Sequence, residues 1–448
     1  MIKKIIPIIF VFAWVKAQSQ TWIPLGAGVN GEVLSLAADP INQKVHVGGF
    51  FFNASNVPVY NCAEWNGSNW QSMDTISSYI SVYSMVFFQN DLYGGGGFGF
   101  DSNSIQLKHL AKFDNSKWNG IDGFLGGLTG EIYALAVDTT NNVLYAAGDF
   151  VQFDTLICNH IISWDGFQWL SLGAGTNGRI YSLFLDSNGY LYAGGDFNIA
   201  GNISVNNIAL WNGINWIGLG QGLGNRVNTI KRYKDKIYAG GQFNRNNGQQ
   251  QDYLACWNGI EWAEIAGINN SVYTLEVYAG ELYVGGRFSF GGTRGIGKWN
   301  GNEFSSLTQG LDFVSIAETP VVSSFALLNE DLYVGGYFET AGSILVNNIA
   351  KWSMPVSVEQ VEETTGFSIN PNPLTVENEF YIQRTAAETA RLLIYDAKGL
   401  LMQTVYLSVG EMQKSFSVSD QTSKGVYFYQ YLQGNENNVK SGKLIVIK

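Results

Sequence analysis

Three features of this 448-residue sequence predict an all-β fold. Charged residues make up only 14% and aromatic residues another 14%, and the 53 glycines favour strands joined by tight turns over long helices. The phrase Leu-Tyr-Ala-Gly-Gly-x-Phe and close variants of it occur seven times, and a tryptophan hairpin such as WNGINW at 211–216 accompanies most copies. Because a repeat of about 48 residues built from short strands is typical of a propeller blade, we expect a seven-bladed β-propeller of four-stranded blades, followed by a small C-terminal β-sandwich.

Residues 1–17 have the features of a signal peptide. Lys3 and Lys4 give a basic start, an apolar run of about eleven residues follows, and Val15-Lys16-Ala17 fits a cleavage site. The run is too short to span a bilayer, so we expect a secreted protein without a transmembrane helix. Loss of this segment removes three lysines and changes the formal charge from −11 to −14. Such an acidic chain repels nucleic acid and anionic lipid, so neither is an expected partner.

Each copy of the repeat divides into four strands separated by turn residues. In the fourth copy, IYSLFLD at 180–186 alternates as a half-buried strand, and YLYAGGDF at 190–197 follows a Ser-Asn-Gly turn. NNIALW at 206–211 is the third strand, and Asn212-Gly213 predicts a hairpin into a fourth strand that begins at Trp216. The Gly-Gly pair allows close approach of backbones, and the paired aromatic residues are expected to pack between blades.

The phrase TWIPLG at residues 21–26 is only the second half of the tryptophan motif. The last copy stops after its third strand, NNIAKW at 347–352, and therefore lacks a fourth. We expect Trp22 to Gly26 to form the outermost strand of the seventh blade, beside Trp352, which closes the ring and leaves no open seam. On this assignment the propeller spans residues 20–352.

Three cysteines, Cys62, Cys158 and Cys256, fall in copies 1, 3 and 5, which are not neighbours. An odd number rules out a complete set of disulfides, so we expect free, buried thiols. The histidines lie on different blades without metal-ligand spacing, and His109 and His160 stand where other copies have asparagine, which indicates a structural role.

The C-terminal part of the chain has a different pattern. Residues 353–366 lose the repeat and gain acidic residues, which indicates a linker. Residues 367–448 then show alternating strands separated by Gly, Asn and Asp turns, which predict the small β-sandwich.

The repeat also resembles known propellers. Gly-Gly after the second strand and the tryptophan hairpin resemble the kelch and galactose-oxidase type. The fuller phrase NNIALWNGINW at 206–216 resembles the repeats of fungal cortical polarity markers and their bacterial secreted counterparts. This resemblance covers residues 20–352 and implies a fold rather than an activity.

The C-terminal module resembles the type A C-terminal sorting domain of type IX secretion cargo. The residues that carry this resemblance are Pro371, Asn372, Pro373, Asp396, Gly399, Gly425, Tyr427 and Lys448. It implies passage through the inner membrane by the N-terminal signal, then export across the outer membrane by the type IX machinery. It further implies removal of the domain and release of the protein or its attachment to the outer cell surface. The alternative is an ordinary immunoglobulin-like accessory domain.

The loops after the second and fourth strands open on one face of a propeller, which is the expected ligand surface. Candidate residues either precede a first strand or stand inside the Gly-Gly-x-Phe phrase. They are Glu32, Glu131, Asp149, Arg179, Asp196, Arg226, Gln242 and Arg287, with Tyr79 and Ser271 at the first kind of position in blades 2 and 6. Segment 308–321 is the largest interruption of the repeat and is expected to form a loop on this face.

Glu131, Asp149 and Asp196 lie on adjacent blades and leave three interpretations open. A hydrolase could use two such carboxylates, or calcium could bind them together with backbone oxygens. Alternatively, Glu131 pairs with Arg179 across blades and the aspartates cap turns. No G-x-S-x-G, H-E-x-x-H or P-loop sequence is present.

The leading hypothesis is a non-enzymatic, secreted or surface-attached protein that binds a glycan or another surface protein and needs no cofactor. Its rivals are an enzyme acting on extracellular polysaccharide and a purely structural surface protein. The enzyme hypothesis requires polar groups that converge at the channel mouth.

Overall fold

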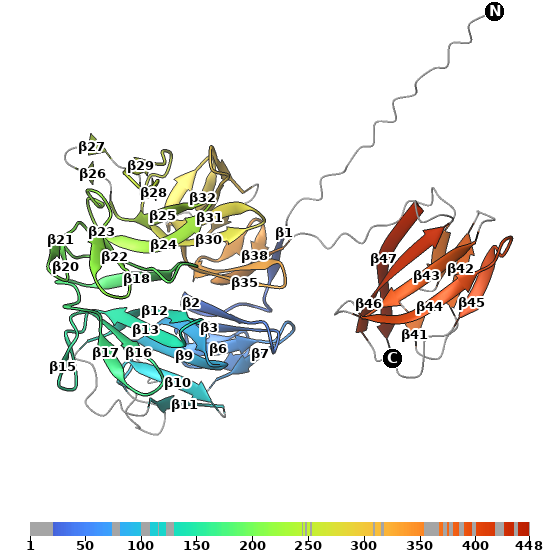
Figure 1. Cartoon of the computed structure of the whole chain (residues 1–448), viewed down its shortest axis with the longest axis horizontal. Helices are drawn as coiled ribbons and strands as arrows, with labels where there is room; N and C mark the ends of the chain where they lie inside the picture. The colour runs from blue at the N-terminus through green and yellow to red at the C-terminus, as the bar shows by residue number, and fades with distance from the viewer. Residues whose placement is uncertain are drawn as a thin grey trace, which may run out of the picture. The chain divides into compact units, whose positions relative to one another are not determined.

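The computed structural model divides the chain into two compact units, Met1–Val356 and Ser357–Lys448 (Figure 1). It describes residues 21–73, 81–99, 108–114, 116–121, 130–243, 245–246, 249–250, 253–307, 310–314, 318–353, 367–370, 374–375, 380–384, 389–396, 400–416, 425–433 and 438–447. Within these ranges all regular secondary structure is β-strand. The predicted signal peptide at 1–17 lies outside the described residues, as does the predicted linker apart from Ser353.

The described part of the first unit contains seven four-stranded antiparallel sheets, numbered here in chain order. Sheets 1 to 3 consist of β2 (Glu32–Asp39), β3 (Lys44–Phe50), β6 (Cys62–Trp65) and β7 (Trp70–Ser72); β8 (Val82–Phe88), β9 (Asp91–Gly96), β10 (Leu110–Asp114) and β11 (Lys117–Gly120); and β12 (Ile132–Asp138), β13 (Val143–Gly148), β16 (Ile161–Trp164) and β17 (Trp169–Ser171). Sheets 4 and 5 consist of β18 (Ile180–Leu185), β19 (Leu191–Gly195), β22 (Ile208–Trp211) and β23 (Trp216–Gly218); and β24 (Val227–Tyr233), β25 (Lys236–Gly241), β28 (Leu254–Trp257) and β29 (Trp262–Glu264). Sheets 6 and 7 consist of β30 (Val272–Tyr278), β31 (Glu281–Phe290), β32 (Thr293–Trp299) and β33 (Phe304–Ser306); and β35 (Val321–Leu328), β36 (Asp331–Tyr337), β39 (Ile349–Ser353) and β1 (Thr21–Pro24).

Short strands decorate the connections between second and third strands. They form the pairs β4 (Asn53–Ala54) with β5 (Val57–Pro58), β14 (Gln152–Phe153) with β15 (Leu156–Ile157), β20 (Ile199–Ala200) with β21 (Ile203–Ser204), β26 (Arg245–Asn246) with β27 (Gln249–Gln250), and β37 (Thr340–Ala341) with β38 (Ile344–Leu345). The last pair gains a third strand, β34 (Leu311–Asp312), which comes from the segment that interrupts the repeat.

The seventh sheet takes its outer strand from the beginning of the chain. β1 pairs antiparallel with β39, and the register places Trp22 opposite Trp352, with their ring centroids 4.7 Å apart. In Figure 1, dark blue β1 lies beside the orange strands of this sheet. The split tryptophan motif is therefore confirmed, with the strand ending at Pro24.

An indole hydrogen bond links sheet 1 to this N-terminal segment. The Trp70 Nε1–H of sheet 1 donates to the carbonyl of Leu25 at 2.7 Å. The same bond joins sheets 4 and 3 through Trp216 and Leu172, at 2.9 Å. Residues 21–25 therefore make the contacts that a fourth strand makes elsewhere in the repeat.

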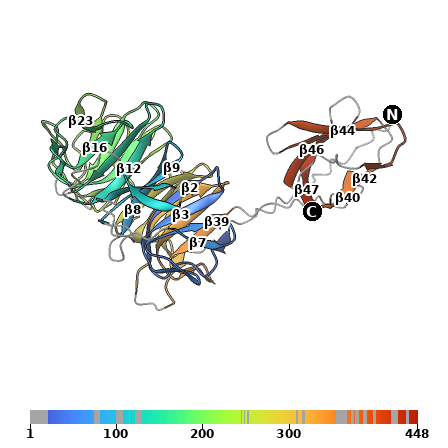
Figure 2. The same cartoon turned by 90° about the horizontal axis from the view of Figure 1, so that it is seen from below.

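First strands of successive sheets contact one another, and β35 of the last sheet contacts β2 of the first. Figure 2 shows β2, β8 and β12 of sheets 1 to 3 in succession. The first glycine of each Gly-Gly pair permits this approach, because a methyl group on Gly194 would lie 2.5 Å from Val227 Cγ1 of the next sheet. The equivalent distance from Gly335 of sheet 7 to Val33 Cγ1 of sheet 1 is 2.4 Å.

The second unit contains two sheets that share one core in its described part. One sheet consists of β40 (Phe367–Asn370), β42 (Phe380–Arg384) and β45 (Gln413–Phe416), and the other of β41 (Leu374–Thr375), β47 (Asn438–Ile447), β46 (Gly425–Gln433), β43 (Ala390–Tyr395) and β44 (Leu401–Leu407). Ile369 and Ile382 of the first sheet pack in a cluster with Leu392, Ile394 and Tyr431 of the second. β41 and β47 pair in parallel, which the sequence did not indicate.

The three cysteines are free and buried, as predicted. Burial raises the pKa of the Cys158 thiol to about 12 and also raises the pKa of Cys62 and Cys256. The thiols therefore behave as small apolar side chains.

Stability should fall when the pH is lowered below about 6.5 because His46 is held neutral. Its side chain is buried, with Asp39 and Glu64 each 3.9 Å from a ring nitrogen and Lys44 beside Glu64. Burial lowers its pKa, although the two carboxylates oppose this shift. A histidine with a lowered folded-state pKa contributes its full stability above the unfolded pKa and loses it as the pH falls towards the folded value, by at most about 1.4 kcal/mol per pH unit.

Urea unfolding at pH 7.5 and 5.5 measures this loss. We expect His46→Tyr, which introduces the residue found at this position in most copies, to reduce the difference between the two pH values. His160, whose pKa burial also lowers, should account for part of what remains. An unchanged difference in His46→Tyr would contradict the assignment.

Candidate functional site

Each first strand carries a β-bulge close to its N-terminal end. In all seven sheets of the described part, the register between first and second strands shifts across one residue. The residues passed over are Leu34, Tyr83, Tyr133, Tyr181, Asn228, Tyr273 and Ser323. A bulge re-aims a side chain and is frequent beside functional sites. Four of the seven positions hold tyrosine, which the sequence analysis did not single out.

Three of these tyrosines form a continuous row across sheets 2 to 4. Tyr83 and Tyr133 have ring centroids 5.5 Å apart, and Tyr133 stacks on Tyr181 at 4.9 Å with an interplanar angle of 22°. The Arg226 guanidinium of sheet 5 lies over the Tyr181 ring, with Cζ 3.5 Å from the centroid. Side chains from four consecutive sheets thus make one connected surface, called here the tyrosine row with Arg226.

Predicted charged residues lie beside this row. The Asp149 carboxylate accepts a hydrogen bond from the Glu131 backbone N–H at 2.6 Å and one from the Tyr133 hydroxyl at 3.1 Å. Arg179 Nε lies 3.7 Å from the same carboxylate. Burial, followed by the charges of Asp149 and Glu131, raises the pKa of Tyr133, so its phenol stays protonated and donates.

The predicted ion pair between Glu131 and Arg179 is wrong, because Arg179 pairs with Asp149 instead. Asp149 follows the second strand, and its carboxylate turns back over the start of the first strand, between Arg179 and Glu131. Glu131 is directed towards the tyrosines, where its charge contributes to the raised pKa of Tyr83, after burial.

In sheets 3 to 6, the residue before the first strand lies beside the variable residue of the Gly-Gly-x-Phe phrase. The backbone N–H groups of Asp196 and Gln242 donate to the carbonyls of Arg179 and Arg226, at 2.8 and 2.9 Å. The Arg287 N–H donates in the same way to Ser271 at 2.9 Å.

The remaining predicted side chains do not converge on one site. Asp196 and Arg287 are exposed and Gln242 is half-buried. Within the described residues, no hydrogen bond or ion pair joins Asp149 to Asp196. Glu32 is half-buried, and burial raises its pKa. The predicted carboxylate pair is therefore not assembled by direct contact.

Ser81, not Tyr79, precedes the first strand of sheet 2. The Gly97 N–H donates to the Ser81 carbonyl, and Val82 pairs with Gly96 as the strand begins. Tyr79 lies outside the described residues. The error arose because two apolar residues, Ile80 and Val82, alternate at this point and either could have started the strand.

No group of three or more His, Cys, Asp or Glu side chains is placed to hold a metal ion in the part of the chain that the structure describes. His109 and His160 occupy the backbone position that Asn207 holds in sheet 4: their carbonyls accept the N–H groups of Gly96 and Gly148, as the Asn207 carbonyl does for Gly195.

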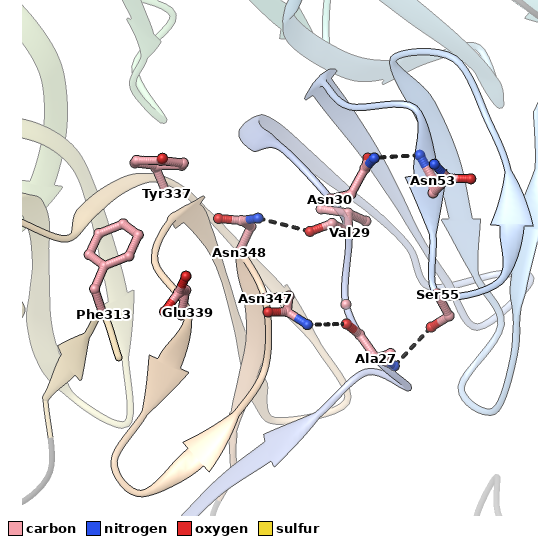
Figure 3. A pocket seen from close by; sticks show the side chains of 11 residues that line it. Ala27, Val29, Asn30, Asn53, Ser55, Phe313, Tyr337, Glu339, Asn347 and Asn348 are labelled. Carbon is pink, nitrogen blue, oxygen red and sulfur yellow. Dashed lines mark hydrogen bonds between the residues drawn. The ribbon is translucent and has the colours of Figure 1, made fainter. Parts of the chain in front are cut away.

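A pocket of about 440 Å³ lies where sheets 7 and 1 meet, and it is called here the junction pocket (Figure 3). It is lined by Ala27, Gly28, Val29, Asn30, Asn53, Ser55, Phe313, Tyr337, Glu339, Asn347 and Asn348. Figure 3 shows Phe313, Tyr337 and Glu339 on one side, Asn30 and Asn53 on the other, and Asn347 and Asn348 between them.

The segment predicted as a ligand-face loop, 308–321, contributes Phe313 to this pocket. Its described part includes β34, which pairs with β37 of the connection after β36. The loop ends one residue earlier than predicted, because β35 begins at Val321. The residues that form the pocket were not predicted from the repeat pattern.

Residues 368–448 match the secretion system C-terminal sorting domain. This sorting domain indicates export by type IX secretion to the cell surface or the medium, and an interaction with the type IX machinery. Asp396 forms the turn after β43, where its carboxylate accepts the Leu400 N–H at 2.8 Å. Gly425 begins β46, and Tyr427 is buried in the core. The other motif residues, Pro371, Asn372, Pro373, Gly399 and Lys448, lie outside the described residues.

No curated protein matches the chain. A solved structure of PorZ, described as an essential bacterial surface component of the type IX secretion system of Porphyromonas gingivalis, is similar with a TM-score of 0.47 and 11% identity. The match covers 93% of this chain and 59% of the PorZ chain. The described residues contain no helix that is long and apolar enough to cross a membrane.

Proposed function

We propose that the predicted domain 20–352 is a closed seven-bladed β-propeller of the kelch or cortical-polarity-marker type, and that it is a non-enzymatic binding module displayed outside the cell. Closure is supported by the contact between β35 and β2 and by the fit of Gly335 against Val33. The pairing of Trp22 with Trp352 adds the missing fourth strand. On this arrangement the tyrosine row with Arg226 lies at the mouth of the central channel.

The observation that carries the binding role is the state of Arg226. Its guanidinium is held against Tyr181, and its Nε is buried with no acceptor among the described residues. A buried donor on a cation that lacks an acceptor costs free energy unless a ligand or water supplies one. Because a charge-assisted bond to a carboxylate is about twice as strong as a neutral one, a ligand with an acidic group fits this site.

The distribution of arginine supports the same ligand class. Residues 20–352 contain six arginines, and three of them, Arg179, Arg226 and Arg287, occupy the predicted positions on sheets 4, 5 and 6. Arg179 is already paired with Asp149, which leaves Arg226 and Arg287 for a ligand. We therefore expect an acidic glycan, or an acidic segment of a surface protein, on sheets 5 and 6.

Arg226→Ala should weaken binding of an acidic polysaccharide at least tenfold, the effect of losing about 1.4 kcal/mol. Binding is measured with the mature full-length chain against neutral and acidic polysaccharides and surface extracts, with and without EDTA. Lys231→Ala is the matched control, because it removes a cation from β24, the strand that directly follows Arg226, and Lys231 already pairs with Glu276.

Equal affinities of Arg226→Ala and the parent protein would overturn the proposed site. Sensitivity to EDTA would instead indicate a calcium requirement. Product formation in the same samples would favour the polysaccharide-degrading alternative. Loss of that activity in Asp149→Asn and Asp196→Asn would then be the test of the carboxylates.

A further inference from the structure

We infer that the junction pocket binds an uncharged sugar ring, at a site separate from the tyrosine row with Arg226. At about 440 Å³, the pocket falls within the roughly 300–1,000 Å³ of typical small-molecule sites. Its amide groups resemble those where sheets 3 and 4 meet, but its aromatic wall includes Phe313, which comes from the segment that interrupts the repeat.

The aromatic wall consists of Phe313 and Tyr337, whose ring centroids are 5.0 Å apart at an interplanar angle of 57°. Phe313 is carried by the segment that interrupts the repeat and is held there by the pairing of β34 with β37. Tyr337 is the variable residue of the last Gly-Gly-x-Phe phrase and is 40% exposed. An aromatic face of this kind packs against the apolar C–H face of a sugar ring.

Three polar side chains around the pocket are held in place by hydrogen bonds that use only their donor or only their acceptor group. Asn30 Oδ1 accepts two backbone N–H groups, from Phe52 and Asn53, at 2.8 Å each, which leaves its Nδ2 to donate. The Asn347 Nδ2 donates to the Ala27 carbonyl at 2.8 Å, which leaves its Oδ1 to accept. Ser55 Oγ accepts the Ala27 N–H at 2.8 Å and keeps its own proton for donation.

Glu339 and Asn53 complete this set. One Glu339 carboxylate oxygen accepts the Val314 N–H at 2.8 Å, which leaves the other available. The side chain of Asn53 has no hydrogen-bond partner among the described residues and offers both an oxygen and an NH₂ group. The pocket therefore presents donors and acceptors in similar number. A hydroxyl both donates and accepts, so a polyhydroxylated ring can use both kinds, whereas an ammonium group can only donate and a carboxylate can only accept.

Charge argues against an acidic sugar in this pocket. No lysine or arginine is among its lining residues, and Glu339 is. Further carboxylates, Glu318 and Glu32, lie near Tyr337. The hydrogen bond to Glu318 raises the pKa of Tyr337, and burial and the charges of the surrounding carboxylates raise it further. A ligand carboxylate brought close to these acidic residues would be repelled. The junction pocket therefore favours an uncharged ligand, whereas Arg226 favours an acidic one.

The test is saturation-transfer NMR and calorimetry on the mature full-length chain with three sets of methyl glycosides: neutral hexoses and pentoses, hexuronic acids, and amino sugars. We expect a neutral glycoside to bind and a hexuronic acid of the same configuration to bind at least tenfold more weakly. Tyr337→Ala and Glu339→Gln should each raise the Kd for the neutral glycoside at least fivefold, while thermal unfolding shows that both variants fold.

Tyr60→Ala is the matched control, because Tyr60 is 42% exposed and contacts Phe52 much as Tyr337 contacts Phe313, but does not line the pocket. It should leave the Kd unchanged, and so should Arg226→Ala, which separates this inference from the proposed function. The inference is overturned if no neutral glycoside binds, if only charged sugars bind, or if binding persists unchanged in both pocket variants.

Discussion

Replacing Trp22 with alanine should lower the free energy of unfolding of the first unit by about 3–5 kcal/mol. The indole is 3% exposed and contacts Trp352, and it belongs to the core cluster of sheet 7. Truncation removes a large apolar area and weakens the hold of a strand that is only four residues long. Urea unfolding followed by tryptophan fluorescence and circular dichroism measures the loss.

Ile23→Ala provides the control for this substitution, since Ile23 is the next residue of the same strand and is 36% exposed. We expect it to cost no more than about 0.5 kcal/mol. Similar losses in the two variants would mean that strand pairing alone, and not the contact between the tryptophans, holds β1 in place.

Gly195→Ala should destabilise the first unit by about 3 kcal/mol, at the upper end of overpacking effects. A Cβ atom on Gly195 would lie 1.9 Å from the carbonyl oxygen of Arg179. Because the obstacle is backbone, it cannot be relieved by a change of rotamer, and the first and second strands of sheet 4 must separate. The shift would also move Arg179 and Asp196, whose backbones are joined at this point.

Gly218→Ala, in the fourth strand of the same sheet, is the control. A Cβ atom there would meet only Val205 Cγ1 at 3.4 Å, an ordinary contact. Thermal unfolding of both variants should show a large decrease in Tm for Gly195→Ala and almost none for Gly218→Ala. A small decrease at Gly195 would show that the two strands yield more easily than a closely packed sheet should.

The strands of the first unit could be predicted because each carries a local signature. Gly-Gly marks the end of a second strand, and Asn-Gly or Asp-Gly between aromatic residues marks a hairpin. The partner of TWIPLG could be found because the motif is divided into two recognisable halves.

The tyrosine row could not be predicted by the same reasoning. Alternation assigns side chains to the two faces of a strand by parity, and a single bulge reverses that assignment. Tyr83, Tyr133 and Tyr181 therefore looked like ordinary members of half-buried strands. The recurrence of Val-Tyr or Ile-Tyr at the start of four first strands was the available signal.

The junction pocket depends on contacts between distant parts of the chain. Ala27 to Asn30 reach Asn347 and Asn348 only because β1 pairs with β39. The interruption at 308–321 was visible as a departure from the repeat, but its pairing with β37 has no signature in the sequence. Residue spacing alone therefore located the loop without revealing the cavity.

The pairing of β1 with β39 also has a consequence for how the protein is made. The partner of the first strand is among the last parts of the unit to be synthesised, so a chain interrupted before residue 349 leaves Trp22 without Trp352 and β36 with an unpaired edge. Unpaired edges and exposed indoles mark a chain for proteolysis or aggregation. We therefore expect a chain truncated before residue 349 to be cleaved by proteases faster than the finished chain, because only the finished chain can complete the seventh sheet.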